Sequence, residues 1–152
     1  MSNFNRSLEV TRFHSFIDEV DLPFTEDISA EFFEPESSIQ WYIAIRSAEM
    51  FRTKNARYPG QSKRKIDEDV SEMTEYAYEV IAKLDADDSF DFNDDYLFEI
   101  ARFSNSTLHN IGAFLGGVAS QEIVKLLTHQ YTPMNHTFIF DGTHWKSQVF
   151  NP

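Results

Sequence analysis

The side chains best suited to chemistry in this chain are a carboxylate and an amine that lie close together in an apolar run. Glu122 and Lys125 are three residues apart, and a buried acid and base of this kind could move protons as catalytic groups. Residues three apart on a helix are also neighbours, so the same two side chains can form an ion pair that covers a polar seam. We favour the ion pair, and a third possibility, an enzyme that works through Glu122 and a histidine, stays open beside it.

Metal binding is the next chemistry that the residue types could support. No two of the 5 histidines form an H-x-x-x-H pair with a carboxylate, and the chain has no cysteine, which removes Cys-ligated zinc, disulfides and thiol nucleophiles. The acidic stretch that begins at Asp85 has the charge of a calcium loop. An EF-hand loop would need Gly where Phe90 stands and Glu where Tyr96 stands. Neither a Gly-rich dinucleotide motif nor a P-loop occurs, so the sequence predicts no metal, no cofactor and no catalytic residue on this chain.

Composition narrows the class of partner. The chain of 152 residues carries 25 acidic and 13 basic side chains, for a formal net charge of −12. Phosphate groups would repel such a chain, which argues against nucleic acid as a partner. The first residues lack the apolar core of a signal peptide. The apolar run closest to a membrane span is interrupted by Gln121, Glu122 and Lys125. We therefore expect an intracellular protein, cytoplasmic or nuclear, with no membrane contact.

Hydrophobic periodicity predicts an α-rich α+β chain with about five helices before a hairpin. Residues 8–20 are ambiguous between an extended segment and a short helix. The expected helices cover residues 27–33 after a Thr25 cap, 39–54 after a Ser37 or Ser38 cap, 66–84 opened by Asp67, 94–103 capped by Asn93, and 111–128 capped within residues 104–107. Residues 136–140 and 145–150 read as strands joined by a turn at 141–144. A two-stranded hairpin is marginal alone, so it must pack on a helix or extend a larger sheet.

The last expected helix is unusual because it contains three of the chain's 5 glycines, Gly112, Gly116 and Gly117. A glycine in a helix costs about 1 kcal/mol relative to alanine, so some backbone should come close to this face. On a helical wheel these glycines form an arc of small residues beside a broad apolar arc, and Gln121, Glu122 and Lys125 form one narrow polar seam. We expect a helix buried on several sides, as a core helix of this domain, as a subunit contact, or as both.

A basic loop interrupts the acidic chain between the second and third helices. It contains Arg57, Tyr58, Pro59 and Gly60, and Pro-Gly is a turn signal. The loop could bind an acidic partner, or it could be a solvated connection between helices.

The order of these motifs resembles the C-terminal part of activating enzymes for ubiquitin-like proteins. The resemblance rests on "GG-x-x-x-QE-I-V-K" in the glycine-rich helix followed by "FIFDG", and it covers roughly Phe13 to Phe150. The "RYPG" loop and the "DDY" segment resemble more narrowly the regulatory subunits of neddylation activating enzymes. The resemblance implies a C-terminal fragment of an adenylation-type, ThiF-like α/β fold. Residues 1–105 would then form a helical segment, and residues 106–152 the last helix and hairpin of that fold.

The resemblance also implies a partner and a role. Such enzymes are heterodimers. Their catalytic subunit binds ATP and zinc and carries the reactive cysteine, and their regulatory subunit has none of these three features. This chain would then support adenylation and thioester transfer without catalytic residues, and would meet the ubiquitin-like modifier indirectly. The expected packing or interface residues are Gly112, Gly116, Gly117, Gln121, Glu122, Lys125, Phe138, Phe140 and Asp141, with Arg57, Tyr58, Pro59 and Gly60 as loop candidates. The alternative is a free-standing acidic helical binding module unrelated to conjugation.

Overall fold

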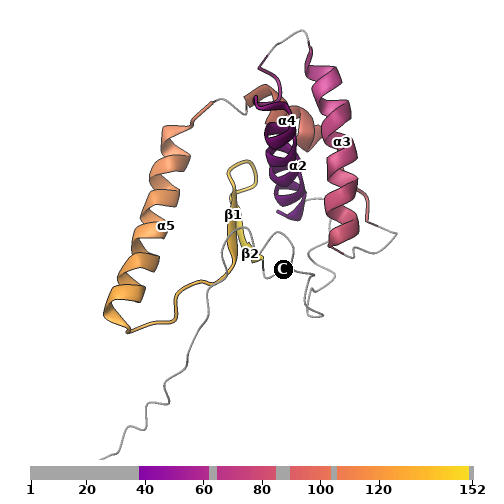
Figure 1. Cartoon of the computed structure of the whole chain (residues 1–152). Coiled ribbons are helices and arrows are strands. Elements are labelled where there is room, and N and C mark those ends of the chain that lie inside the picture. The colour runs from indigo at the N-terminus through magenta and orange to yellow at the C-terminus, as the bar shows by residue number, and fades with distance from the viewer. Residues whose placement is uncertain (1–37, 62–64, 85–89, 104–105, 151–152) are drawn as a thin grey trace, which may run out of the picture.

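A computed structural model describes residues 38–61, 65–84, 90–103 and 106–150 of the chain. The helices in these ranges are α2 (Ile39–Asn55), α3 (Ile66–Lys83), α4 (Asp95–Phe103) and α5 (His109–Thr128), and the strands are β1 (Thr137–Asp141) and β2 (Lys146–Phe150). Figure 1 shows α2, α3 and α4 gathered on one side, α5 on the other, and the hairpin between them. The described part is therefore α-rich with a small antiparallel sheet, as expected. The segments predicted over residues 8–20 and 27–33 lie outside the described residues.

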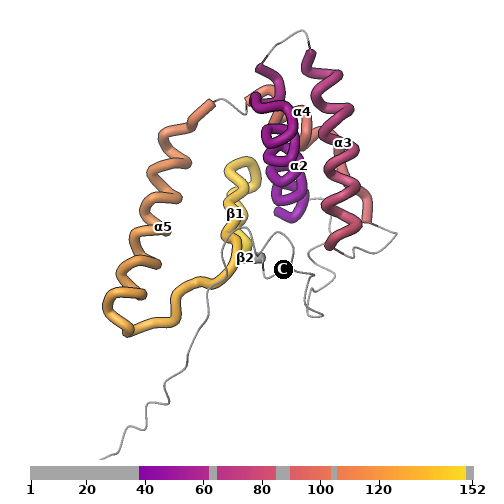
Figure 2. Tube along the Cα trace, viewed as in Figure 1, coloured from indigo at the N-terminus to yellow at the C-terminus, as the bar shows by residue number. Residues whose placement is uncertain are grey.

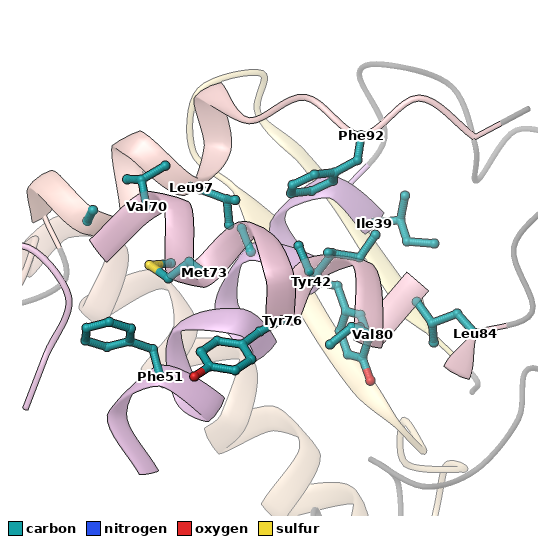
Figure 3. Packing of buried hydrophobic residues seen from close by; sticks show 14 of the residues in the cluster. Ile39, Tyr42, Phe51, Val70, Met73, Tyr76, Val80, Leu84, Phe92 and Leu97 are labelled. Carbon is teal, nitrogen blue, oxygen red and sulfur yellow. The ribbon is translucent and has the colours of Figure 1, made fainter. Parts of the chain in front are cut away.

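Helices α2, α3 and α4 pack on one another as a three-helix unit (Figure 2) because apolar side chains of all three share one core. Met73 of α3, Phe51 of α2 and Leu97 of α4 are fully buried in this core, and Figure 3 shows how the buried side chains gather. The predicted periodicity of these helices is confirmed at most positions, including Val70, which is 5% exposed. Burial of such side chains is worth about 1.5–3 kcal/mol each, so this unit holds most of the stability of the described chain.

The start of α3 and the start of α4 agree with the sequence. Acidic side chains fill the first turn of α3, where the helix macrodipole favours negative charge. The Asn93 side-chain oxygen accepts a hydrogen bond from the backbone N–H of Asp95 at 2.9 Å, which confirms Asn93 as the cap of α4.

Two other predicted helix caps are not found among the described residues, from which Ser37 and residues 104–105 are absent. Ser38 stands at the cap position of α2, but its side chain makes no capping hydrogen bond. Its backbone N–H instead donates to the Gln148 side chain of β2 at 3.1 Å, so a long-range contact holds the start of α2. Leu108, not a residue of 104–107, occupies the cap position of α5. That helix therefore begins without side-chain capping.

The hairpin forms as predicted, with the turn displaced by one residue. Strands β1 and β2 are antiparallel, and Phe138 lies opposite Val149 in the register. Asp141 belongs to β1, and the turn runs from Gly142 to Trp145, where Trp145 has a φ of 55°. Ile139 of β1 is 7% exposed and packs into the helical core. The hairpin thus reaches the core through one side chain of β1.

Candidate functional site

Helix α5 is the least covered element of the described chain. It is the most apolar of the helices by sequence, yet none of its residues is buried. Ile123 is 55% exposed and Leu127 is 76% exposed. The other large apolar side chains that α5 and its ends leave exposed are Leu108, Phe114, Leu115, Val124, Leu126 and Tyr131. A continuous apolar surface of this kind marks a contact with another chain segment, another protein or a membrane.

The glycines of α5 lie on this open surface. At Gly112, Gly116 and Gly117 a Cβ atom would meet no described atom within 4 Å, apart from the helix's own backbone and neighbours. The prediction of a core helix within this chain is therefore wrong for the described residues, because no described element covers the small-residue arc. Nothing in the sequence of α5 itself distinguishes burial by this chain from burial by another segment.

The polar seam of α5 is organised by Glu122. One carboxylate oxygen accepts from Lys125 Nζ at 2.7 Å, and the other accepts from the backbone N–H of Met134 at 2.6 Å. These hydrogen bonds hold the pKa of Glu122 below its usual range, Lys125 having the larger effect. The predicted ion pair is present, and it also ties the helix to the segment that leads into β1. Gln121 is exposed on the same seam.

Strand β1 lies next to α5 through aromatic contacts. The rings of Phe114 and Phe140 are 4.4 Å apart between centroids, and Ile111 lies next to Gly142. An apolar cavity of about 200 Å³ opens here, lined by Tyr42, Ile45, Arg46, Leu115, Thr137, Phe138, Ile139 and Phe140. Phe138 and Phe140 are half-buried. The structure thus brings the predicted β1 residues and α5 together around a space that the described chain leaves open.

Asp141 at the end of β1 shapes the hairpin turn. It is 3% exposed, and its Oδ2 is 2.7 Å from His144 Nδ1 while its Oδ1 accepts from the Thr143 backbone N–H at 2.8 Å. Burial alone would raise the pKa of this carboxyl, but the hydrogen bonds from His144 and Thr143, with the Trp41 indole close by, hold it below its usual value. Asp141 therefore has a structural role in fixing the turn against α2.

The basic loop forms a second, separate site that packs on α3 and α4. Arg57 donates to both carboxylate oxygens of Asp69, at 2.5 and 2.7 Å, and the Gly60 backbone N–H donates to Asp69 at 2.9 Å. Gly60 has a φ of 68°, and a Cβ there would lie 1.7 Å from the backbone oxygen of Ala101. Pro59 is buried, and Tyr58 is 37% exposed with Arg52 over its ring at 4.5 Å. Residues 57–60 therefore form a packed joint, and residues 62–64 of the basic loop lie outside the described residues.

Two polar residues with structural roles escaped the sequence analysis. Asp69 is 2% exposed, and Gln40 is fully buried, with its amide bonded to the Asp91 backbone oxygen at 3.0 Å and to the Asn93 N–H at 3.2 Å. Each lies at the edge of an apolar helix face, which is the signal that could have identified it. Within the described ranges no three His, Asp or Glu side chains are grouped so as to hold a metal ion.

Comparison with known proteins assigns the chain to a family. It is 35% identical over 146 residues to the NEDD8-activating enzyme E1 regulatory subunit AXR1 of Arabidopsis thaliana, which covers 95% of this chain and 27% of that protein. The NEDD8-activating enzyme E1 regulatory subunit of Danio rerio is 31% identical over 145 residues, covering 94% of this chain and 27% of that protein. This chain is related to NEDD8-activating enzyme E1 regulatory subunits.

The chain is also similar to a ubiquitin-activating enzyme, and in every case the similarity covers only one portion of the other protein. Ubiquitin-activating enzyme E1 1 of Triticum aestivum is 26% identical over 117 residues, covering 77% of this chain and 11% of that protein. The chain spans about a quarter of the length of the NEDD8-activating enzyme E1 regulatory subunits that it matches, 27% for the Arabidopsis and Danio proteins. No protein-family model matches the chain.

The relation to NEDD8-activating enzyme E1 regulatory subunits bears on how α5 is interpreted. By length and composition alone the 20 residues of α5 could cross a membrane, contrary to the expectation that no apolar run here is long enough. A core helix of a soluble protein passes the same test. The Arabidopsis alignment covers 95% of this chain and so must include most of α5. The exposed helix is therefore part of the stretch that these subunits share.

Proposed function

We propose that this chain works as part of a regulatory subunit in the heterodimeric activating enzyme of the neddylation pathway. The observation that carries this proposal is the similarity of nearly the whole chain to regulatory subunits of NEDD8-activating enzymes. In this role the chain supports ATP-dependent adenylation and thioester transfer by a catalytic partner subunit. ATP and zinc then belong to that partner, the chain itself contributes no catalytic residue, and the complex is cytoplasmic or nuclear.

The exposed face of α5 supports this role. The proteins that this chain matches are several times longer than the chain, since it aligns with 27% of the Arabidopsis protein. We propose that the remainder of a regulatory subunit provides the cover for Gly112, Gly116 and Gly117, as a sheet of the adenylation-type, ThiF-like fold. Small residues allow another backbone to approach a helix closely, so the face with these three glycines is suited to packing against a sheet.

Strand β1 is the second element that such a fold would use. It pairs with β2 on one edge, and Phe138, Ile139 and Phe140 border the open apolar cavity beside α5. A further strand added to the other edge of β1 would satisfy its backbone groups and fill that cavity with side chains. The division at residues 105 and 106, between the helical unit and α5 with its hairpin, is the boundary that we propose for the two parts of the chain.

The test is reconstitution. The tagged chain is co-expressed with the catalytic subunit and the preceding part of the regulatory subunit of the same source. We expect all three to co-purify and to support ATP–pyrophosphate exchange with the ubiquitin-like modifier. Exchange by this chain alone would contradict the non-catalytic role, and failure to co-purify with either partner would contradict the proposal as a whole.

The rival role, a free-standing acidic module for basic proteins, has less support. Such a module would bind its partner through its acidic helices or through the loop from Arg57 to Gly60. In that loop Arg57 is paired with Asp69 of the same chain. The same reconstitution separates the two roles, since a free-standing module would not require the preceding part of a regulatory subunit.

A further inference from the structure

A second cavity lies where the start of α2, the first turns of α4 and the hairpin turn meet. It measures about 360 Å³ and shares no lining residue with the apolar cavity beside α5. Two aromatic side chains, Trp41 and Tyr96, and two carboxylates, Asp95 and Glu99, line it, and Thr143 and His144 of the turn complete it. Its volume is within the lower range of small-ligand sites.

The two aromatic rings of the lining pack edge to face on each other, so one ring covers part of the other's face and a ligand would contact the ring faces that stay uncovered. The centroids of the Trp41 and Tyr96 rings are 4.7 Å apart, and the ring planes are 85° from parallel. Ring faces carry partial negative charge and attract cations, and tryptophan does so most strongly. A planar guanidinium can also stack on such faces, which an ammonium group cannot do. The aromatic walls therefore favour a flat cation.

The charged groups around the cavity favour a cation as well. Glu99 pairs with Arg102 of its own helix at 3.2 Å, but both side chains are about half exposed, so this pair is weak and easily exchanged. His144 is held through Nδ1 by Asp141. Two carboxylates, Asp95 and Glu99, thus line the cavity, with Arg102 as the cation paired to one of them, in a chain of net charge −12.

We propose that this cleft binds an arginine side chain of a partner protein, with the guanidinium on the Trp41 and Tyr96 rings and paired to Glu99 or Asp95. The cleft is built from residues other than those of α5, so the inference goes beyond the proposed function and does not rest on it. An anion would be repelled by the same carboxylates, and a neutral group would gain no charge pairing.

The test uses Trp41 as its own reporter. The chain has 2 tryptophans, so Trp145→Phe leaves Trp41 as the only source of tryptophan fluorescence in the full chain. This variant is titrated with Nα-acetyl-arginine amide and with the citrulline counterpart, which has the same shape without the charge. We expect a saturable change with the arginine compound and at least about tenfold weaker binding of the citrulline compound, because charge-assisted hydrogen bonds are lost.

Carboxylate variants place the binding in the cleft. In the same background, Glu99→Gln or Asp95→Asn should weaken binding of the arginine compound about threefold. Glu79→Gln removes an exposed carboxylate of α3 outside the cleft and should leave binding unchanged. Far-UV circular dichroism confirms that each variant is folded. The proposal is overturned if the signal does not saturate, if citrulline binds equally well, or if Glu79→Gln weakens binding as much as the two cleft variants do.

Discussion

At the scale of single residues, the joint between α2, α3 and α4 depends on one carboxylate and one glycine. Asp69 accepts hydrogen bonds from Arg57 and from the backbone of Gly60, and Gly60 lies so close to the backbone of Ala101 that there is no room for a Cβ atom. A side chain that hydrogen-bonds several partners cannot be replaced without leaving some of them unsatisfied. Both residues therefore yield predictions about stability.

Asp69→Asn should lower the free energy of unfolding and make it depend less on pH in the acid range. Hydrogen bonds from Arg57, more than those from Gly60, lower the pKa of Asp69 below its ordinary value of 3.8. The stability that this shift contributes is complete above pH 3.8 and is lost as the pH falls through the lower folded-state pKa. We expect a loss of about 2 kcal/mol at neutral pH, less than for a fully buried pair, because Arg57 remains 33% exposed.

Urea unfolding at a series of pH values measures this effect. Glu68→Gln is the matched control, since that carboxylate is 73% exposed and pairs with Lys65 at 3.7 Å. It should change the free energy of unfolding by less than about 0.5 kcal/mol. Equal losses for the two variants would show that the Asp69 hydrogen bonds contribute nothing specific.

Gly60→Ala should be among the most damaging single-methyl changes in this chain. The new Cβ would lie 1.7 Å from the Ala101 oxygen, and the φ of 68° is unfavourable for any residue with a side chain. We expect a loss of about 3 kcal/mol or more, measured by thermal unfolding. Gly116→Ala is the control, because a Cβ there meets nothing within 4 Å, and it should be neutral or slightly stabilising. If Gly60→Ala leaves the thermal stability unchanged, the backbone of α4 does not lie as close to Gly60 as the structure has it.

At the scale of elements, a buried polar side chain fixes how α4 joins the other helices. Gln40 of α2 bonds the backbone at Asp91 and Asn93, just before α4 begins. This contact holds the segment in front of α4 against α2, and Phe92 in that segment is 9% exposed. The position of α4 thus depends on an amide as well as on apolar packing.

Gln40→Leu should cost about 1–3 kcal/mol, although the new side chain is apolar and of similar length, because two backbone groups lose their partner. Gln61→Leu changes an exposed position and should have little effect. Chemical denaturation of both variants measures the difference. If Gln40→Leu is as stable as the parent chain, the amide contacts do not hold α4 in place.

The elements also show how far the sequence was informative. Periodicity predicted α2, α3 and α4 correctly because neighbouring parts of the same chain bury their apolar side chains, and it predicted the hairpin, of which Ile139 enters the core. The same pattern in α5 predicted burial that the described chain does not provide, because periodicity shows that a face needs cover and not which segment supplies it. The position of Asp69 and Gln40 at the edge of an apolar helix face could have indicated burial, but their partners, backbone groups and a loop arginine, could not be predicted from a local pattern.

At the scale of the whole molecule, the described chain is a stable helical unit joined to a helix that only the hairpin and the segment before it contact (Figure 1). The core draws on α2, α3, α4 and the residues of β1 that face them. No residue of α5 is buried. Substitutions on α5 should therefore act differently in this chain and in a complete subunit.

Gly116→Leu measures this difference. In the 152-residue chain we expect no loss of stability, and a small gain of up to about 1 kcal/mol, because leucine favours the helix over glycine. In a reconstituted regulatory subunit the same change should cost about 1–3 kcal/mol or more by overpacking, and should lower the yield of heterodimer. Thermal unfolding and co-purification yield are measured in both settings. Equal effects in the two would mean that no backbone approaches Gly116.

The exposed face of α5 has a consequence for the life of the chain in a cell. Leu127 and Tyr131, more than 70% exposed at the end of the helix, are the kind of apolar surface that chaperones and proteolytic quality control engage. If a partner covers this face as proposed, a copy without that partner leaves the apolar surface open to quality control, and assembly covers it. We expect the half-life of the chain to rise with the supply of its partner, so that its abundance follows stoichiometry and needs no separate regulator.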